Sequence, residues 1–204
     1  MPKKELKDRI LYVGLDDSNH AGKRKGEIIT AVFSHIYEDS LKTHFPRERK
    51  IEEDIQSKNW IGKKRKRDFR FTILTHNISS KNSYNLFLVA PYLIQNYLEK
   101  IYPPDLDKIE IYFDGKMMKS WEEMLQEDFK KIIPIGCFNF TGPNKTNVPY
   151  VLGVADRISH FLFKGEFGNL DSLLKNPKMV PINCEDTDFI KRKEGFSNSG
   201  KFYK

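Results

Sequence analysis

Residues 9–16 read Arg-Ile-Leu-Tyr-Val-Gly-Leu-Asp, a short run of β-forming residues that ends on an acidic side chain. Such a run is typical of a strand that is buried on both faces of a sheet. Residues 17–26 are polar and basic, and residues 27–37 are again rich in β-branched side chains. The sequence therefore predicts two strands that form a hairpin with a basic tip.

Outside the hairpin, strand patterns alternate with helix patterns. Residues 68–76 alternate apolar and polar side chains, and residues 83–102 repeat apolar residues at helical spacing around Pro91. Pro91 must either kink this helix or mark its true first turn. The predicted fold class is α/β, a mixed sheet with helices on its faces. The remaining predicted elements are strands at 109–114 and 132–138 and helices at 121–129 and 149–163.

The length and composition fit one domain. The chain has 204 residues, of which 39% are hydrophobic and 13% aromatic, enough to bury one core. We expect a domain core over about 9–164, an insertion over about 38–67 and a C-terminal extension over 165–204.

Two features bear on location. No apolar run approaches the roughly 20 residues of a membrane-spanning helix, and the first residues lack the apolar centre of a secretory signal, so we expect no membrane partner. Cys137 and Cys184 lie far apart and form no Cys-x-x-Cys motif. A disulfide framework or cysteine-based zinc site is therefore not expected, and a reducing, cytoplasmic location is the simplest prediction.

The charge favours a polyanionic partner. The net charge is +7, and two runs concentrate the basic residues. Such runs can neutralise phosphates of DNA or RNA, and Trp60 and Phe69 beside the second run could stack on bases. The alternatives are a solvated loop or, in a eukaryote, a nuclear-import signal. The predicted nucleic-acid-binding residues are Lys23, Arg24, Lys25, Lys63, Lys64, Arg65, Lys66 and Arg67.

Three aspartates occupy positions where an ionised carboxylate would destabilise the fold. Asp16 closes the first predicted strand, Asp114 closes the fourth, and Asp156 interrupts an apolar helix. Burial among such neighbours is destabilising unless a cation or strong hydrogen-bond donors compensate the charge. Ligand sites form outside the carboxyl ends of parallel strands, so Asp16 and Asp114 would meet there if their strands are adjacent and parallel. Asp156 would approach from its helix.

Carboxylates that converge in this way repel one another unless they share a hard cation. Mg²⁺ or Mn²⁺ suits an all-oxygen site, and such ions activate water for phosphodiester cleavage. We therefore predict Asp16, Asp114 and Asp156 as metal ligands and catalytic residues. His160, one helical turn after Asp156, would ligate the metal or orient water.

Each of these residues also has a plainer interpretation. Asp16 and Asp114 could belong to ordinary turns that follow strands, because aspartate satisfies turn backbones with its own side chain. Asp156 could form a salt bridge inside the fold. His160 could be a hydrogen-bonded core residue.

The order of elements and the acidic positions resemble the ribonuclease H-like superfamily. The chain looks closest to an uncharacterised prokaryotic branch whose first strand ends Asp-Glu-Ser-Gly and whose last core helix carries an Ala-Asp pair. The stretches that carry the resemblance are Leu15-Asp16-Asp17-Ser18-Asn19, Ile111-Tyr112-Phe113-Asp114-Gly115 and Val154-Ala155-Asp156-Arg157-Ile158.

The resemblance implies a five-stranded mixed sheet in the order 3-2-1-4-5, with helices on both faces. It also implies that Asp16, Asp114 and Asp156 are metal ligands of a nuclease or related phosphoryl-transfer enzyme. The leading hypothesis is a nuclease that depends on Mg²⁺ or Mn²⁺. The alternatives are a ribonuclease H-like module that binds nucleic acid without catalysis, as a scaffold, and a small-molecule phosphohydrolase.

Overall fold

The structure is a computed structural model of the whole chain. It describes residues 9–18, 26–35, 39–41, 69–76, 84–101, 105–114, 119–141, 147–164, 179–182 and 196–197. The statements below concern these residues.

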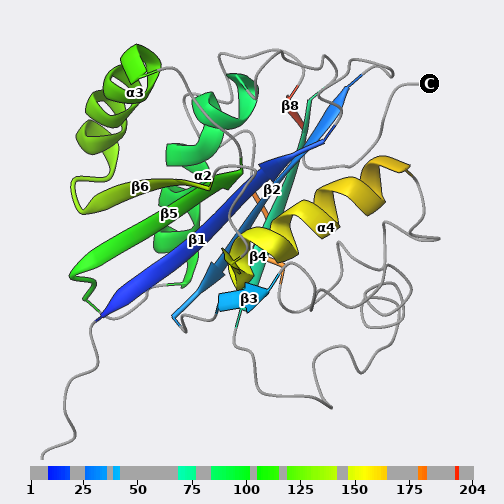
Figure 1. The fold of residues 1–204 in the computed structure, drawn as a ribbon, viewed down its shortest axis with the longest axis horizontal. Coiled ribbons are helices and arrows are strands. Elements are labelled where there is room, and N and C mark those ends of the chain that lie inside the picture. The colour runs from blue at the N-terminus through cyan, green and yellow to red at the C-terminus, as the bar shows by residue number, and fades with distance from the viewer. Residues whose placement is uncertain are drawn as a thin grey trace, which may run out of the picture.

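The main sheet is mixed and has the predicted strand order. Apart from the short edge strand β8, its five strands run β6-β5-β1-β2-β4, which confirms the order 3-2-1-4-5 when these five are numbered along the chain (Figure 1). β1 pairs with β2, and β2 with β4, in antiparallel ladders, whereas β1–β5 and β5–β6 are parallel. The strands are β1 (Ile10–Asp17), β2 (Glu27–Ser34), β4 (Phe69–His76), β5 (Lys108–Asp114), β6 (Gly136–Thr141) and β8 (Phe196–Ser197).

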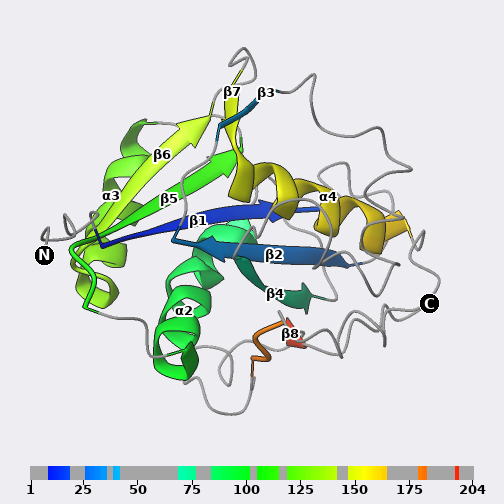
Figure 2. The same cartoon turned by 90° about the horizontal axis from the view of Figure 1, so that it is seen from below.

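Helices cover both faces of the sheet, as predicted. Figure 2 shows α2 (Tyr84–Ile101) and α4 (Tyr150–Lys164) on opposite sides of it. Apolar residues of α2 and of α3 (Lys119–Ile132) pack against one face, and those of α4 pack against the other. A separate two-stranded sheet pairs β3 (Asp39–Leu41) with β7 (Asn147–Pro149), which leads directly into α4.

The alternation of side chains along β1 explains why it needs two covering layers. Leu11, Val13 and Leu15 are fully buried in the core under α2, while Tyr12 packs with the core under α4. β2 is buried along its whole length. Strands of this kind read as nearly continuous apolar runs, which is the pattern that predicts them.

The structure decides between the two alternatives for Pro91 and corrects one predicted boundary. Pro91 lies inside α2 and so does not mark its first turn. The strand predicted from residue 132 begins at Gly136, because α3 continues to Ile132 and Ile133 N–H still donates to the carbonyl of Phe129 (2.7 Å). The apolar residues after Lys131 continue the buried face of the helix and are not the start of a strand.

The C-terminal extension contributes to the core. Residues 179–182 run beside β4, where Val180 N–H donates to the carbonyl of Phe71 (2.8 Å) and Thr72 Oγ1 donates to the carbonyl of Val180 (2.7 Å). Val180 and Ile182 are buried on the α2 side. The sequence of this segment shows no firm period, and its hydrogen bonds come from β4 and from α2, where Lys100 Nζ donates to the carbonyl of Pro181 (2.6 Å).

None of the helices in the described ranges is both long enough and apolar enough to span a membrane.

Gly14 is the point at which α4 comes closest to the sheet. A Cβ atom at this position would overlap the backbone of Val151 and Leu152 in the first turn of the helix. Backbone atoms of a packed helix cannot move aside as the end of a flexible side chain can. The absence of a side chain at Gly14 therefore sets how closely α4 packs on β1.

We predict that Gly14→Ala destabilises the fold by more than about 3 kcal/mol, because overpacking against backbone forces α4 away from β1. Urea denaturation followed by circular dichroism measures the free energy of unfolding. Gly136→Ala is the matched control, since its Cβ would meet the carbonyl oxygen of Ile133 at 3.1 Å, a contact that a shift of a few tenths of an ångström relieves. Equal losses in the two variants would contradict this account.

Candidate functional site

The carboxyl end of β1 is fixed by hydrogen bonds to β2. Ser18 N–H donates to the carbonyl of Ile28 (2.9 Å), and Ile28 N–H donates to Ser18 Oγ (2.9 Å). Ser18 is itself buried. These bonds extend the ladder past Asp17, so the acidic residues at the end of β1 stand on a rigid strand pair.

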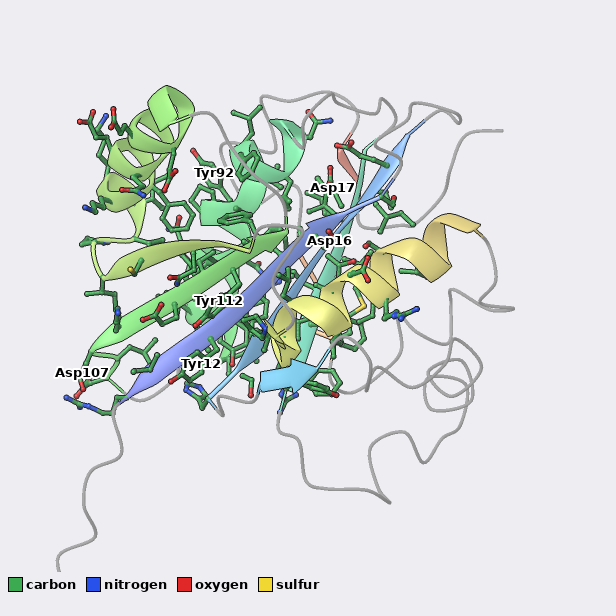
Figure 3. The ribbon with its side chains drawn as sticks, viewed as in Figure 1. Tyr12, Asp16, Asp17, Tyr92, Asp107 and Tyr112 are labelled. Atoms are coloured by element: carbon green, nitrogen blue, oxygen red, sulfur yellow. The ribbon has the colours of Figure 1, made fainter. Side chains whose placement is uncertain are left out.

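Asp16 lies on the face of the sheet that α4 covers. Its side chain is buried, with 6% of the residue exposed, and Ser159 of α4 donates a hydrogen bond from Oγ to Asp16 Oδ2 (2.7 Å). Ser159 Oγ also lies 3.1 Å from the carbonyl oxygen of Asp156. A hydroxyl has one proton to donate, and the shorter contact to a charged acceptor is the stronger. The burial predicted for Asp16 is confirmed, and Figure 3 shows Asp16 near the end of β1.

Asp114 has the register that the sequence predicts. β1 and β5 are adjacent and parallel, and Leu15 pairs with Phe113, so positions 16 and 114 each follow the last pair of the same ladder. Asp114 also ends β5 opposite Thr141 of β6. The side chain of Asp114 lies outside the described part, so its approach to Asp16 stays a prediction.

Asp156 differs from the expectation. The sequence predicts a carboxylate buried in an apolar helix, whereas Asp156 is exposed on α4. The apolar face of the helix, which includes Ala155 and Ile158, packs on the sheet, and the exposed Asp156 is not part of that face. Ser159 is the α4 residue that contacts Asp16. The side chain of His160 lies outside the described part.

Two further acidic residues are buried at this end of the hairpin. Asp17 is 3% exposed and Glu27 is fully buried. Asp17 pairs with Ile29, whose side chain belongs to the core under α2, and Glu27 precedes Ile29 by two residues on the same strand. Side chains alternate along a strand, so Asp17 and Glu27 lie on the α2 face and Asp16 on the α4 face. Neither Asp17 nor Glu27 was predicted as a site residue.

The acidic residues at the other end of the sheet have different surroundings. Asp107, just before β5, is exposed and accepts a hydrogen bond from Arg9 Nη2 (3.0 Å). This bond and the charge of Asp107 raise the pKa of Arg9. Figure 3 shows Asp107 at the opposite end of the sheet from Asp16. Exposed ion pairs of this type contribute little to stability. Asp107 is an exposed carboxylate paired with arginine, whereas Asp16 is buried.

The predicted phosphate-binding residues lie in segments outside the described ranges. These are Lys23, Arg24 and Lys25 at the hairpin tip, and the run of Lys63, Lys64, Arg65, Lys66 and Arg67. Among the side chains that the structure does describe, no three His, Cys, Asp or Glu residues are grouped so that they could hold a metal ion. A site with three such ligands would therefore have to include a side chain outside the described part, and the predicted ligand Asp114 is one of these.

Sequence comparisons give no relative for this chain: no protein-family model matches it, and no curated protein matches it.

We predict that Ser159→Ala destabilises the protein by about 1–3 kcal/mol, because it removes a donor from a buried carboxylate. Asp156→Asn, on the same helix, should change the free energy of unfolding by less than about 0.5 kcal/mol, since that side chain is exposed. Chemical denaturation in the absence of divalent ions measures both. A larger loss in Asp156→Asn than in Ser159→Ala would contradict the assignment of Ser159 as the partner of Asp16.

Proposed function

We propose that the chain is a divalent-metal-dependent nuclease whose site is built around Asp16. The observation that carries this proposal is a buried carboxylate at the carboxyl end of β1, with position 114 next to it in the parallel ladder. Open α/β sheets bind their ligands at this edge. A cation at this edge would stabilise the buried Asp16 carboxylate together with its hydrogen bond from Ser159.

The strand order supports a ribonuclease H-like fold. A sheet in the order β6-β5-β1-β2-β4, with an antiparallel half, a parallel half and helices on both faces, is what that resemblance implies. Fold alone does not establish an activity, so the functional argument rests on Asp16 and its surroundings.

The donor set around Asp16 suits a hard cation. Asp16 offers carboxylate oxygens, and the Ser159 hydrogen bond to Oδ2 fixes the orientation of the carboxylate, as partners of ligand residues do in metal sites. Asp16 and Asp114 would hold Mg²⁺ or Mn²⁺, and the exposed Asp156 of α4 is the proposed third ligand. When bound, the ion would supply Lewis acidity and lower the pKa of a coordinated water.

The protein's own part of the mechanism is positioning. Ser159 holds the Asp16 carboxylate against rotation, and the Ser18 bonds hold the strand end that carries it. The basic residues 23–25 and 63–67 would neutralise the backbone phosphates of DNA or RNA, in keeping with the net charge of +7. The proposed setting is the cytoplasm.

We predict that Asp16→Asn abolishes cleavage of nucleic acid in Mg²⁺ or Mn²⁺, because an amide is a poor ligand for these ions. The test is a panel of single-stranded and duplex DNA, RNA and hybrid substrates, each with Mg²⁺, Mn²⁺ or a chelator. Asp107→Asn is the matched control and should cleave like the wild type, since Asp107 lies at the far end of the sheet. Wild-type cleavage rates in Asp16→Asn would refute the proposed role.

Metal binding should also stabilise the folded protein. A ligand that binds only the folded state raises stability by about 2.7 kcal/mol at a concentration one hundred times its dissociation constant. We therefore expect Mn²⁺ to raise the melting temperature of the wild type and of Asp107→Asn, but not that of Asp16→Asn. No shift in the wild type, together with binding of nucleic acid in a chelator, would instead identify a binding module without catalysis.

A further inference from the structure

Thr30 occupies a position directly across the sheet from Asp16. The two residues are paired in the antiparallel ladder between β1 and β2. Residues directly opposite each other project to the same face, with Cβ atoms about 4.5–5.5 Å apart. Thr30 therefore shares the α4 face with Asp16, and Ile28 and Val32 on either side of it belong to the core under α4.

The hydroxyl of Thr30 lowers the stability of the fold at its buried position. The residue is fully buried, and among the described residues no group forms a hydrogen bond with Oγ1. A buried hydroxyl without a partner is destabilising by about 1–3 kcal/mol, and valine would fill the same space without that loss. A threonine in the run Ile28-Ile29-Thr30-Ala31-Val32 needs a partner that the described polypeptide does not supply.

Three elements bring polar groups together at this point. β1 supplies Asp16, α4 supplies Ser159, and β2 supplies Thr30, each at most 6% exposed. Ser159 is already engaged with Asp16 Oδ2, so it is the Thr30 hydroxyl that is available to a further group. A buried water requires two to four polar partners, and a carboxylate facing a hydroxyl supplies them.

We propose that Thr30 is a positioning residue of the Asp16 site, whose hydroxyl forms a hydrogen bond with a water of the bound ion's hydration shell. This inference rests on the proposed function. Mg²⁺ and Mn²⁺ suit the role because Mg²⁺ in particular keeps several waters when it binds to one or two carboxylates. Ser159 would orient the Asp16 carboxylate, and Thr30 would orient a water bound to the ion that Asp16 holds.

The test compares Mn²⁺ binding by calorimetry in the full-length wild type, Thr30→Val, Thr30→Ser and Thr72→Val. Thr30→Val keeps the shape and removes the hydroxyl, so its dissociation constant for Mn²⁺ should rise roughly 10- to 100-fold, as expected for a lost partner in the shell around a metal. Thr30→Ser keeps a hydroxyl at this position. It should therefore bind Mn²⁺ with a dissociation constant within about threefold of the wild type.

Thr72→Val is the matched control. Thr72 is also a fully buried strand threonine, but it donates to the carbonyl of Val180 and lies on the α2 face opposite Ala31. It should lose stability and keep wild-type Mn²⁺ affinity. Urea denaturation without metal measures the free energy of unfolding of each variant. Thr30→Val should be at least as stable as the wild type under these conditions. If the hydroxyl had a structural role, Thr30→Val would instead be less stable.

The outcomes separate this inference from the proposed function. If the wild type binds no Mn²⁺, both fail. If the wild type binds Mn²⁺ and Asp16→Asn does not, but Thr30→Val binds as the wild type does, only the role of Thr30 is overturned. Should Thr30→Val fail to fold, Thr30→Ala replaces it, and the pair Thr30→Ala and Thr30→Ser decides by the same difference in affinity.

Discussion

The contact between the first turn of α4 and the middle of β1 is the constraint on which the site depends. Gly14 has no side chain, so the backbone at Val151 and Leu152 rests directly on the strand. From that point the helix runs across β1 and β2, and its third turn brings Ser159 to Asp16. A larger residue at position 14 would lift the helix and separate the hydroxyl from the carboxylate.

The mixed sheet gives β1 two different neighbours, and the site uses both. On its parallel side, β5 brings position 114 level with Asp16, which is how α/β sheets assemble ligand groups from distant stretches of chain. On its antiparallel side, β2 places Thr30 opposite Asp16 and, through the Ser18 bonds, fixes the strand end. Asp16 thus lies beside Thr30 of β2 and Ser159 of α4, which share no local sequence motif with it.

Much of the fold follows from local patterns in the sequence. The apolar run at 9–16 predicts β1, the alternation at 68–76 predicts β4, and the polar segment at 17–26 predicts the hairpin of β1 with β2. The resemblance supplied the strand order, and the burial of Asp16 was correctly expected from its place at a strand end. The positions of the strands and helices depend on periodicities of two and 3.6 residues, which a sequence displays directly.

What the sequence did not reveal depends on contacts between distant segments. Asp156 stands in an apolar run, but it is exposed on α4, whereas Ser159 is buried and forms the hydrogen bond with Asp16. The sequence signal for Thr30 was a hydroxyl residue inside the apolar run of β2. The signal for Ser159 was a hydroxyl residue inside the apolar run of α4. Residues 179–182 have no periodic pattern that would predict their place, which depends on hydrogen bonds with β4 and α2.

The central claim is that Asp16 holds a divalent ion under α4, and anomalous diffraction from crystals grown with Mn²⁺ tests it most directly. The account predicts an anomalous peak at coordinating distance from the Asp16 carboxylate, with Ser159 still bound to Oδ2 and a water between the ion and Thr30. A lysine or arginine paired with Asp16, and no peak at the end of β1, would contradict it.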